Sequence, residues 1–583
     1  MHDNRTKTRK TIRSSAVIFL FLIFAGVSFT LAESPGETVF TAMEDELNRT
    51  MQKLKMENLD KPYYVEFVVT DFQNFEIDSA FGDIVRIEDS RSRYFAVDLR
   101  VGDYSFDNTN FISDYYGTRQ RPVAISFEDN YDALRQDIWL ATDRAYKDAL
   151  EKLARKKAYV QTKAITDLTE DLAKEEPYVE IAPKAELSVD KKSWEKTVAE
   201  LSAIFKEYPG INDSSVTFKA VAINRYFLNN EGFKSRKGTF IILLEAAAST
   251  QAEDGQSVSN FKSFYARDAG GLPEKENAAA KIRVLAQKTL DLSRSVQLTE
   301  YVGPVIFTEE ASGEFFRQLL AANISSPQTP LVADERFSEM IQKPKLASKL
   351  NLRILPPFFD VADDPAIMSW NGSHPIGFFN VDDDGVPAKK VSHQKDGKLV
   401  DLLMSRIPTK KIKSSNGHAR GAVYIPVEGR QSNLFITSKE TMSYQSLKER
   451  LIELCRDMGL EYGIIVKKLR DKNLSLQTDS EADLTPAQAK TELCFPVEAY
   501  RISVKDGKEE LIRGLEFEGT TVRALKDIIA AGDDAHLYNF MLGHNFELPA
   551  SIVSPSVLVE EMELKKTESK PSKLPLLKSP LQE

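Results

Sequence analysis

The sequence predicts an α+β protein with two folded domains, an N-terminal domain of a sheet with helices and a β-rich C-terminal domain. The chain of 583 residues is too long for one hydrophobic core, because single cores stop growing near roughly 250–300 residues. Its 42% hydrophobic and 28% charged residues are typical of a globular protein. Helical and strand periodicities alternate in the first half, whereas strands and glycine turns dominate the second.

Residues 1–32 have the organisation of a secretory signal peptide. Basic residues between Arg5 and Arg13 precede an apolar run from Ala16 to Phe29, and small residues before Glu33 suit signal peptidase. An uncleaved anchor is the alternative, but the run is shorter than the ~20 residues that usually span a bilayer. We therefore expect an exported protein, periplasmic or extracellular, with no membrane span after cleavage.

The composition of the mature chain bears on its partners. Cleavage would change the formal net charge from −10 to about −14. An acidic chain without a basic patch argues against nucleic-acid binding. The two cysteines, Cys455 and Cys494, lie in a helical and a strand-like segment, where two free thiols are at least as compatible with the pattern as a disulfide.

The predicted N-terminal domain, residues 33–232, alternates helices and strands. Its most distinctive element is a long helix over 129–157, whose apolar stripe from Tyr131 to Leu153 needs a partner surface, most plausibly the preceding sheet. The other expected elements are a helix over 39–56, strands over 63–72, 81–106 and 214–232, a linker-like loop over 174–191, and a helix over 192–208 that ends at Pro209-Gly210.

The predicted C-terminal domain, residues 233–564, consists mainly of strands, loops and glycine turns. A strand over 239–249 comes first, and helices over 275–296 and 309–322 interrupt the strands. Residues 565–583 are rich in Lys, Pro and Ser, so we expect a flexible tail.

Several short segments follow one another in the order of a known protein family. Each segment alone is ordinary turn chemistry, but together, from Asn229 to Glu560, they resemble the TldD/PmbA metallopeptidase family. The resemblance implies barrel-like curvature in the C-terminal domain. The segments that carry it are Asn229-Asn230-Glu231-Gly232, Gly303-Pro304-Val305-Ile306-Phe307, Asp363-Asp364-Pro365, Asp382 to Ala388, Asp396 to Arg406, Ser415 to Arg420, and Ile552 to Glu560.

The residues that would hold the zinc ion of catalytic family members are replaced in this chain. Such members carry HExxxH on the helix after the Gly-Pro-Val strand and a cysteine near the C-terminus; imidazoles and thiolate hold Zn²⁺, and the Glu accepts a proton from the bound water. Here Arg317, Gln318 and Ala322 occupy those helix positions, and the segment over 538–549 contains no Cys. Arginine has no lone pair for a metal. The resemblance therefore implies a zinc-less, PmbA/TldE-like member without cofactor.

The remaining candidate site residues give weaker signals. Arg317 could turn toward the cleft and hold a peptide carbonyl or carboxylate, with Asn230, His418 and Arg420 nearby; we favour the alternative, a surface arginine in a salt bridge. His536 and His544 are weak candidates for a relocated metal site. Asp382-Asp383-Asp384 lacks the EF-hand pattern and is interpreted as a solvated turn. A Ser/His/Asp triad cannot be argued from sequence.

Three functional hypotheses follow. The first is an exported non-catalytic subunit that binds unfolded peptide, or completes a dimer with a catalytic TldD-like subunit or with itself. The second is an active metallopeptidase with a relocated metal site. The third is a stand-alone peptide-binding module of the cell envelope.

Overall fold

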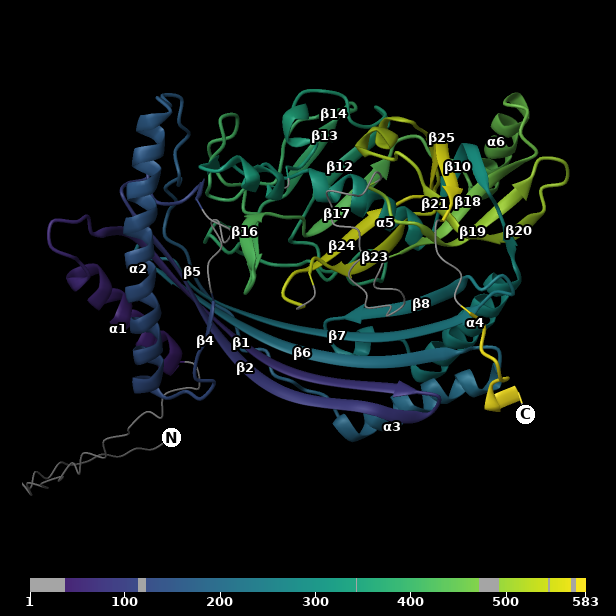
Figure 1. Cartoon of the computed structure of the whole chain (residues 1–583), viewed down its shortest axis with the longest axis horizontal. Coiled ribbons are helices and arrows are strands. Elements are labelled where there is room, and N and C mark those ends of the chain that lie inside the picture. Colours follow the sequence, from purple (N-terminus) through teal and green to yellow (C-terminus); the bar gives the residue numbers. More distant parts are fainter. Residues whose placement is uncertain are drawn as a thin grey trace, which may run out of the picture.

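The computed structural model describes residues 37–113, 122–341, 343–470, 492–543, 546–567 and 573–582. The predicted signal peptide, residues 1–32, and His544 lie outside these ranges. Figure 1 shows long curved strands of one large sheet in the lower half of the molecule and the C-terminal half above them. None of the helices in the described ranges combines the length and hydropathy that a bilayer crossing needs.

The large sheet has the strand order β4-β2-β1-β6-β7-β5. On the outer edge of β7, β5 pairs with residues 234–236 and β8 pairs with residues 242–251. Every residue of β1 from Glu66 to Ser79 pairs with a residue of β6, so these two long antiparallel strands are joined without interruption. Its strands are β1 (Pro62–Ala80), β2 (Asp83–Val101), β4 (Val123–Ala124), β5 (Val179–Ile181), β6 (Asp213–Asn229), β7 (Lys234–Gln251) and β8 (Ser257–Ala266).

Helices cover one face of this sheet. α1 (Glu37–Lys53) and α2 (Tyr131–Thr162) pack on one end, and α3 (Lys191–Ala203) and α4 (Lys275–Arg294) pack on the other. Along β7, Ile242 and Leu244 belong to the core under α3 and α4, whereas Ile241 and Leu243 belong to the core beneath the C-terminal half. This alternation follows from the two-residue period of a strand and gives the sheet two buried faces.

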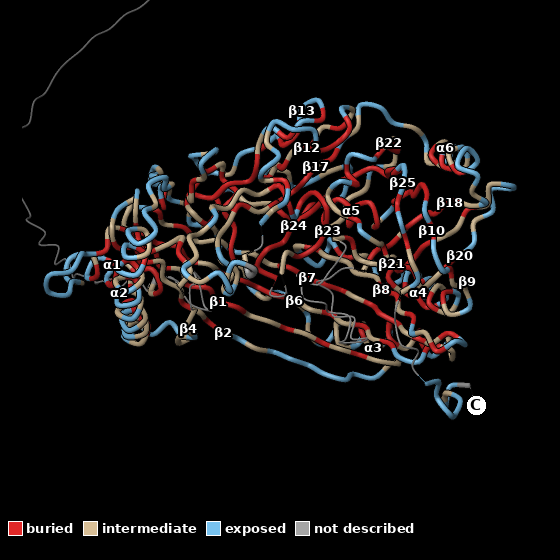
Figure 2. The backbone as a smooth tube through the Cα atoms, turned by 45° about the horizontal axis from the view of Figure 1, so that its top comes forward, coloured by how far each residue is buried: buried red, intermediate tan, exposed pale blue. Residues whose placement is uncertain are grey.

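The C-terminal half contains two further sheets around α5 (Glu310–Leu319). One has the order β21-β25-β10-β18-β19-β20-β9 with β22 on β25, and the other has the order β14-β13-β12-β17-β24-β23. Figure 2 shows buried backbone concentrated where these sheets meet, and α6 (Tyr444–Asp457) packs on the outer side of the first.

The strands of these two sheets have the following bounds. The first sheet comprises β9 (Val296–Gln297), β10 (Glu300–Phe307), β18 (Tyr462–Leu469), β19 (Pro496–Ser503), β20 (Glu509–Arg513), β21 (Leu515–Phe517), β22 (Ile528–Ala531) and β25 (Val557–Lys566). The second comprises β12 (Phe359–Asp363), β13 (Val391–Lys395), β14 (Lys398–Leu399), β17 (Asn433–Ser438), β23 (His536–Met541) and β24 (Pro549–Ser554). Two small ladders pair β15 (Ala419–Ala422) with β16 (Ile425–Gly429) and β3 (Phe111–Ile112) with β11 (Leu331–Val332).

The predicted α+β class is confirmed, and the strand orders in the described ranges are those of open sheets. The predicted long helix is confirmed as α2, whose Leu134 and Ile138 pack against the sheet. The N-terminal sheet continues past residue 232, because β6 and β7 form a hairpin and β8 extends it to Ala266. The segment over 174–191, expected as a loop, contributes the short strand β5. β25 continues to Lys566, two residues into the expected flexible tail.

Candidate functional site

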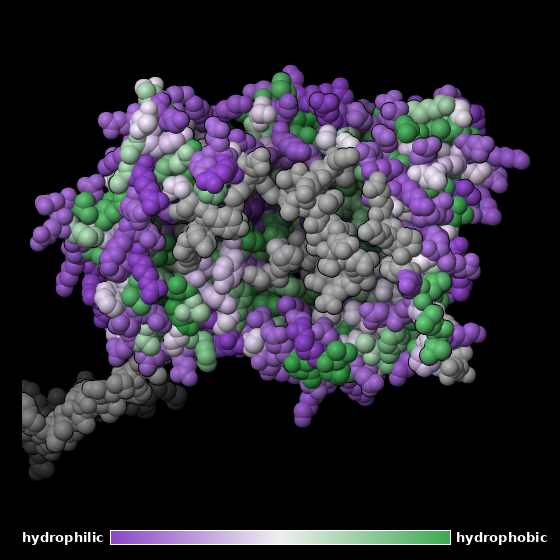
Figure 3. All heavy atoms as spheres, in the orientation of Figure 1, coloured by the Kyte–Doolittle hydropathy of each residue, from purple (hydrophilic) through white to green (hydrophobic). Residues whose placement is uncertain are grey.

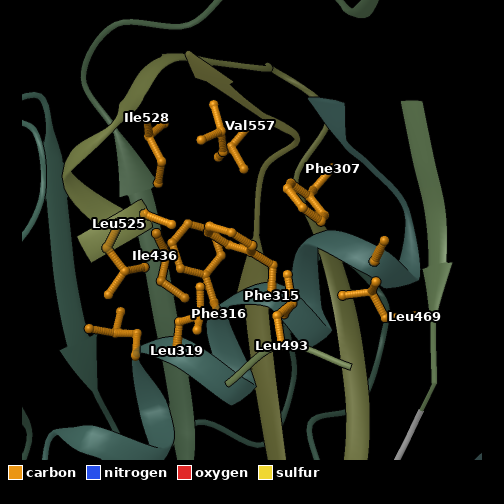
Figure 4. Packing of buried hydrophobic residues seen from close by; sticks show 14 of the residues in the cluster. Phe307, Phe315, Phe316, Leu319, Ile436, Leu469, Leu493, Leu525, Ile528 and Val557 are labelled. Atoms are coloured by element: carbon orange, nitrogen blue, oxygen red, sulfur yellow. The ribbon is translucent and has the colours of Figure 1, made fainter. Parts of the chain in front are cut away.

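The helix at the position of the family's metal motif, α5, has an apolar and a polar side. Phe315, Phe316 and Leu319 are fully buried and point into the core, as Figure 4 shows, toward Phe307, Ile436 and Leu525. They follow the three- and four-residue steps of a helix face, which accounts for the burial of this side of α5. The polar side, which carries Glu314, Arg317 and Gln318, faces β23 and β24.

Glu314 is the centre of a buried hydrogen-bond network on that polar side. Arg317 donates from Nε to both carboxylate oxygens at 2.7 and 2.9 Å, and Gln318 donates from Nε2 at 2.7 Å. Both lie near Glu314 because residues three and four apart share a helix face. From β23, the hydroxyl of Tyr538 donates to the same carboxylate at 2.5 Å.

The network also ties α5 to the segment before β19. The Oε1 of Gln318 accepts the backbone N–H of Cys494 at 2.8 Å, and the guanidinium of Arg317 lies 5.4 Å from the ring centroid of Phe540 in β23. The side chain of Arg317 is 10% exposed and that of Glu314 is 2% exposed. The expectation of a surface salt bridge was therefore right about the ion pair and wrong about the surface: Glu314 draws the guanidinium inward.

These residues do not fit a zinc ion. Arg317 carries a permanent positive charge and no lone pair, and Gln318 uses both ends of its amide in the network. Ala322 is exposed and has no ligating atom. Glu314 could donate oxygen, but its two oxygens already accept from three side chains. In the described residues no group of three His, Cys, Asp or Glu side chains is arranged to hold a metal.

The segment that would carry the family's cysteine ligand is occupied by other chemistry. His536 begins β23, and its Nδ1 lies 2.5 Å from the carbonyl oxygen of Asp534. Glu547 accepts the backbone N–H of Val423 at 2.9 Å through Oε1, whereas its buried Oε2 lacks a hydrogen-bond donor among the described residues. Burial raises the pKa of Glu547 to about 7. Sequence reasoning missed this carboxyl group.

The predicted cleft residues do not converge on α5. Asn230 accepts from the N–H of Val65 at 2.7 Å and donates to the carbonyl of Tyr63 at 3.0 Å, which fixes the turn between β6 and β7. Arg420 donates to the carbonyl of Pro549 at 2.7 Å, and burial lowers its pKa to about 10. Both residues join chain segments, and neither side chain contacts Arg317 in the bonds described.

His418 belongs to a buried trio with Asp363 and Ser432. Its Nε2 lies 3.2 Å from Oδ1 of Asp363, and the hydroxyl of Ser432 donates to the same oxygen. The side chains of His418 and Asp363 are fully buried. In a hydrolase triad the histidine stands between serine and carboxylate; here the carboxylate stands between the other two. The trio joins β12, β15 and the start of β17 and lacks the arrangement for nucleophilic attack.

Asp382 and Asp383 are buried and Asp384 is half-buried, which corrects the expectation of a solvated turn over 382–384. Asp383 accepts from Arg225 of β6 and Lys237 of β7, each at 2.7 Å. Burial alone would raise its pKa, but the two cations lower it well below its usual range. Asp384 accepts the N–H of Arg406 at 2.7 Å. The turn therefore anchors the C-terminal half to the large sheet.

Two surface cavities lie away from α5. One of about 550 Å³ is lined by the outer face of β12, β13 and β17 and by Trp370. The other, of about 380 Å³, lies between α2 and the segments over 326–331 and 409–411. Among the described residues that line these two cavities, neither Arg317 nor Gln318 is present.

The comparisons with known proteins agree with the fold. Residues 300–566 match the model of the PmbA/TldA metallopeptidase C-terminal domain, which corresponds to β10 through β25. A protein described as a metalloprotease from Archaeoglobus fulgidus is 34% identical over 186 residues, 31% of this chain and 36% of that protein. The chain thus aligns with about a third of the length of this curated relative.

Three solved structures resemble nearly the whole chain. They are a protein described as a modulator of DNA gyrase from Thermotoga maritima (TM-score 0.54, 15% identity, 90% of this chain and 100% of that one), TldE from Thermococcus kodakarensis (0.55, 13%, 90% and 99%), and a second described gyrase modulator from Bacteroides thetaiotaomicron (0.53, 13%, 91% and 98%). At these identities the likeness concerns the fold.

Proposed function

This chain belongs to the TldD/PmbA family, and from that premise we propose that it is an exported, non-catalytic member. The observation that carries the proposal is the buried ion pair of Arg317 and Glu314. Where the family resemblance puts a zinc-binding imidazole, this chain has a cation that neutralises a carboxylate of its own helix. The positive charge of the guanidinium would repel a divalent cation bound at this position.

We propose further that the chain binds unfolded peptide, or completes a dimer with a catalytic TldD-like subunit or with itself. The resemblance implies pairing of zinc-less with zinc-bearing members in this family. The proposed export rests on the signal-like organisation of residues 1–32.

The test is to purify residues 33–583 and measure bound zinc by mass spectrometry together with hydrolysis of unfolded peptides. A catalytic TldD-like protein, treated identically, serves as the positive control. We expect substoichiometric zinc and no turnover by the chain alone. Stoichiometric, chelator-removable zinc with turnover would overturn the proposal.

The second hypothesis, an active peptidase with a relocated metal, needs ligands elsewhere. Single variants H418A, H536A and H544A would each lower metal content if that histidine were a ligand. The third hypothesis, a stand-alone envelope peptide-binding module, is separated from a pairing role by affinity purification from envelope extract. Recovery of a catalytic TldD-like subunit favours pairing, and recovery of peptides without such a subunit favours the module.

A further inference from the structure

Strand β2 has a free edge along its first half. β4 pairs with β2 only at Tyr94 and Phe95, and the N–H of Ile125 donates to the carbonyl of Arg93 at 3.0 Å. Among the described residues no strand pairs with the outer side of residues 83–92. An exposed strand edge is a template for pairing with another chain, and Figure 1 shows β2 on the side of the sheet away from the C-terminal half.

This edge also exposes apolar side chains. Val85 is 69% exposed, Ile87 47% and Ile84 37%. Figure 3 shows hydrophobic atoms gathered at the lower margin of the molecule, over the region where β2 and α3 lie in Figure 1. β-Branched residues on an open edge favour strand pairing, so the apolar groups and the open backbone point to the same kind of partner.

The charges along the edge are self-complementary about Ile87. We propose that residues 83–91 pair antiparallel with the same residues of a second copy of this chain, with Ile87 opposite Ile87. In that register Arg86 lies opposite Glu88 and Asp83 lies opposite Arg91 of the second copy. Two-fold symmetry produces each pair twice, and opposite charges directly across a sheet stabilise it.

Charges on an edge strand usually prevent pairing, but their order here prevents other registers and permits this one. If the register between the two copies shifted by two residues, Arg86 would no longer lie opposite Glu88 and Ile87 would no longer lie opposite Ile87. Within the chain Arg86 already lies 2.9 Å from both Asp78 and Glu88 and also contacts Glu76. Lys219 also pairs with Glu76 at 2.9 Å, so the three carboxylates exceed the two cations by one charge, which a second Arg86 across the edge would offset.

The face that carries α3 leaves room for the second copy. Asp89 pairs with Lys191 at the start of α3, so the odd-numbered residues of the edge lie on the α3 face. α3 packs over β1 and β6 as well as β2. If the two copies of α3 are centred over β1, three strand spacings separate them, ~14 Å, which exceeds the 8–10 Å of packed helices. Ile87 and Val85 would lie in the space between them.

Because the charge order of the β2 edge is self-complementary, we identify the strand that pairs with it as that of a second copy of this chain. This inference specifies a surface for the self-pairing named in the proposed function, and it does not depend on the absence of catalysis, which zinc content and turnover test separately. Its test is the mass of residues 33–583 by light scattering and sedimentation over a concentration series. We expect a dimer, with E88R alone or R86E alone raising the dimer dissociation constant by about tenfold or more, because each puts two like-charge pairs across the edge.

An equimolar mixture of E88R and R86E should restore the dimer, because each Arg then meets a Glu on the other chain. V302E, at another half-exposed strand valine, is the matched control and should leave the mass unchanged. Circular dichroism of each variant checks folding. A monomer at every concentration, a dimer indifferent to both charge variants, or a dimer formed only with a TldD-like chain would each overturn the proposal.

A cross-link reads the register without altering charge. In a C494S background, I87C should form a disulfide-linked dimer on mild oxidation. V85C, on the same strand and face, should not, because its two copies would be offset by four residues, ~13 Å, beyond the reach of a disulfide. Cross-linking through V85C but not I87C would exclude the proposed register.

Discussion

Arg317 donates its Nε–H to both carboxylate oxygens of Glu314, 2.7 and 2.9 Å away and one turn earlier on the same helix. Buried ion pairs give little net stability, because desolvation offsets the attraction, but removing one partner leaves an uncompensated charge. The stability of this part of α5 therefore depends on both partners of the pair being present.

Replacing Arg317 with Met should lower the free energy of unfolding by about 3–5 kcal/mol, because the carboxylate of Glu314 would stay buried without its cation. The measurement is urea unfolding followed by circular dichroism. R336M is the control, since Arg336 pairs with Asp334 while 84% exposed and its loss should cost less than about 1 kcal/mol. The double variant E314M/R317M should recover most of the loss; equal effects of R317M and R336M would contradict the role of the pair.

Glu309, directly before α5, has φ 52° and ψ −135°. This backbone region is populated almost only by glycine and costs other residues about 1–3 kcal/mol. E309G should therefore raise the midpoint of thermal unfolding, even though it removes the 3.4 Å ion pair with Lys467. The variant K467M, which removes only the ion pair, separates the two effects. A lower midpoint for E309G than for K467M would be inconsistent with strain at this residue.

Glu547 should make stability fall as pH rises. Its carboxyl pKa is about 7 in the folded chain against 4.5 for the ordinary value, so the folded state keeps a proton that the unfolded state releases. The loss should develop between about pH 4.5 and 7 and level off above 7, reaching about 3 kcal/mol. E547Q should remove this slope: its stability should match the wild type near pH 4.5 and exceed it at pH 8. Parallel pH profiles of the two proteins would disprove the assignment.

Asp383 should make the stability depend on pH in the opposite direction. Its folded pKa lies below its usual range because of Arg225 and Lys237, so its contribution is present above the unfolded pKa near 3.8 and declines as pH falls below it. D383N should cost about 3–5 kcal/mol at pH 7, since two partly buried cations lose their buried partner. D360N, which removes a half-exposed ion pair with Lys439, is the control. Unfolding curves at pH 7 measure how much stability each variant loses.

Ser432 should not react with fluorophosphonate probes of serine hydrolases. Its hydroxyl donates to Asp363, and the residue is fully buried, so no histidine activates it and the probe cannot reach it. Mass spectrometry of the probe-treated protein, with chymotrypsin as positive control, provides the measurement. A labelled peptide containing Ser432 would revive a hydrolase based on the trio.

The sequence predicted the regular elements that have strong periodicity and left their polar contacts open. The helix expected over 309–322 is present as α5, which ends at Leu319, and the apolar steps at Phe315, Phe316 and Leu319 account for its burial in the core. Glu314 stands outside the motif positions and was not predicted, although its three- and four-residue spacing to Arg317 and Gln318 is a signal of contact on one helix face. The aspartates over 382–384 read as a solvated turn because their cations, Arg225 and Lys237, are far away in sequence and only the fold brings them together.

The aspartate turn also constrains the order of events during synthesis. Asp383 follows Arg225 by 158 residues and Lys237 by 146, so both cations leave the ribosome long before their counterion exists. Contacts of such separation close slowly. Until then the nascent N-terminal sheet presents an unneutralised pair of cations, and a chain truncated before residue 382 would retain that defect permanently.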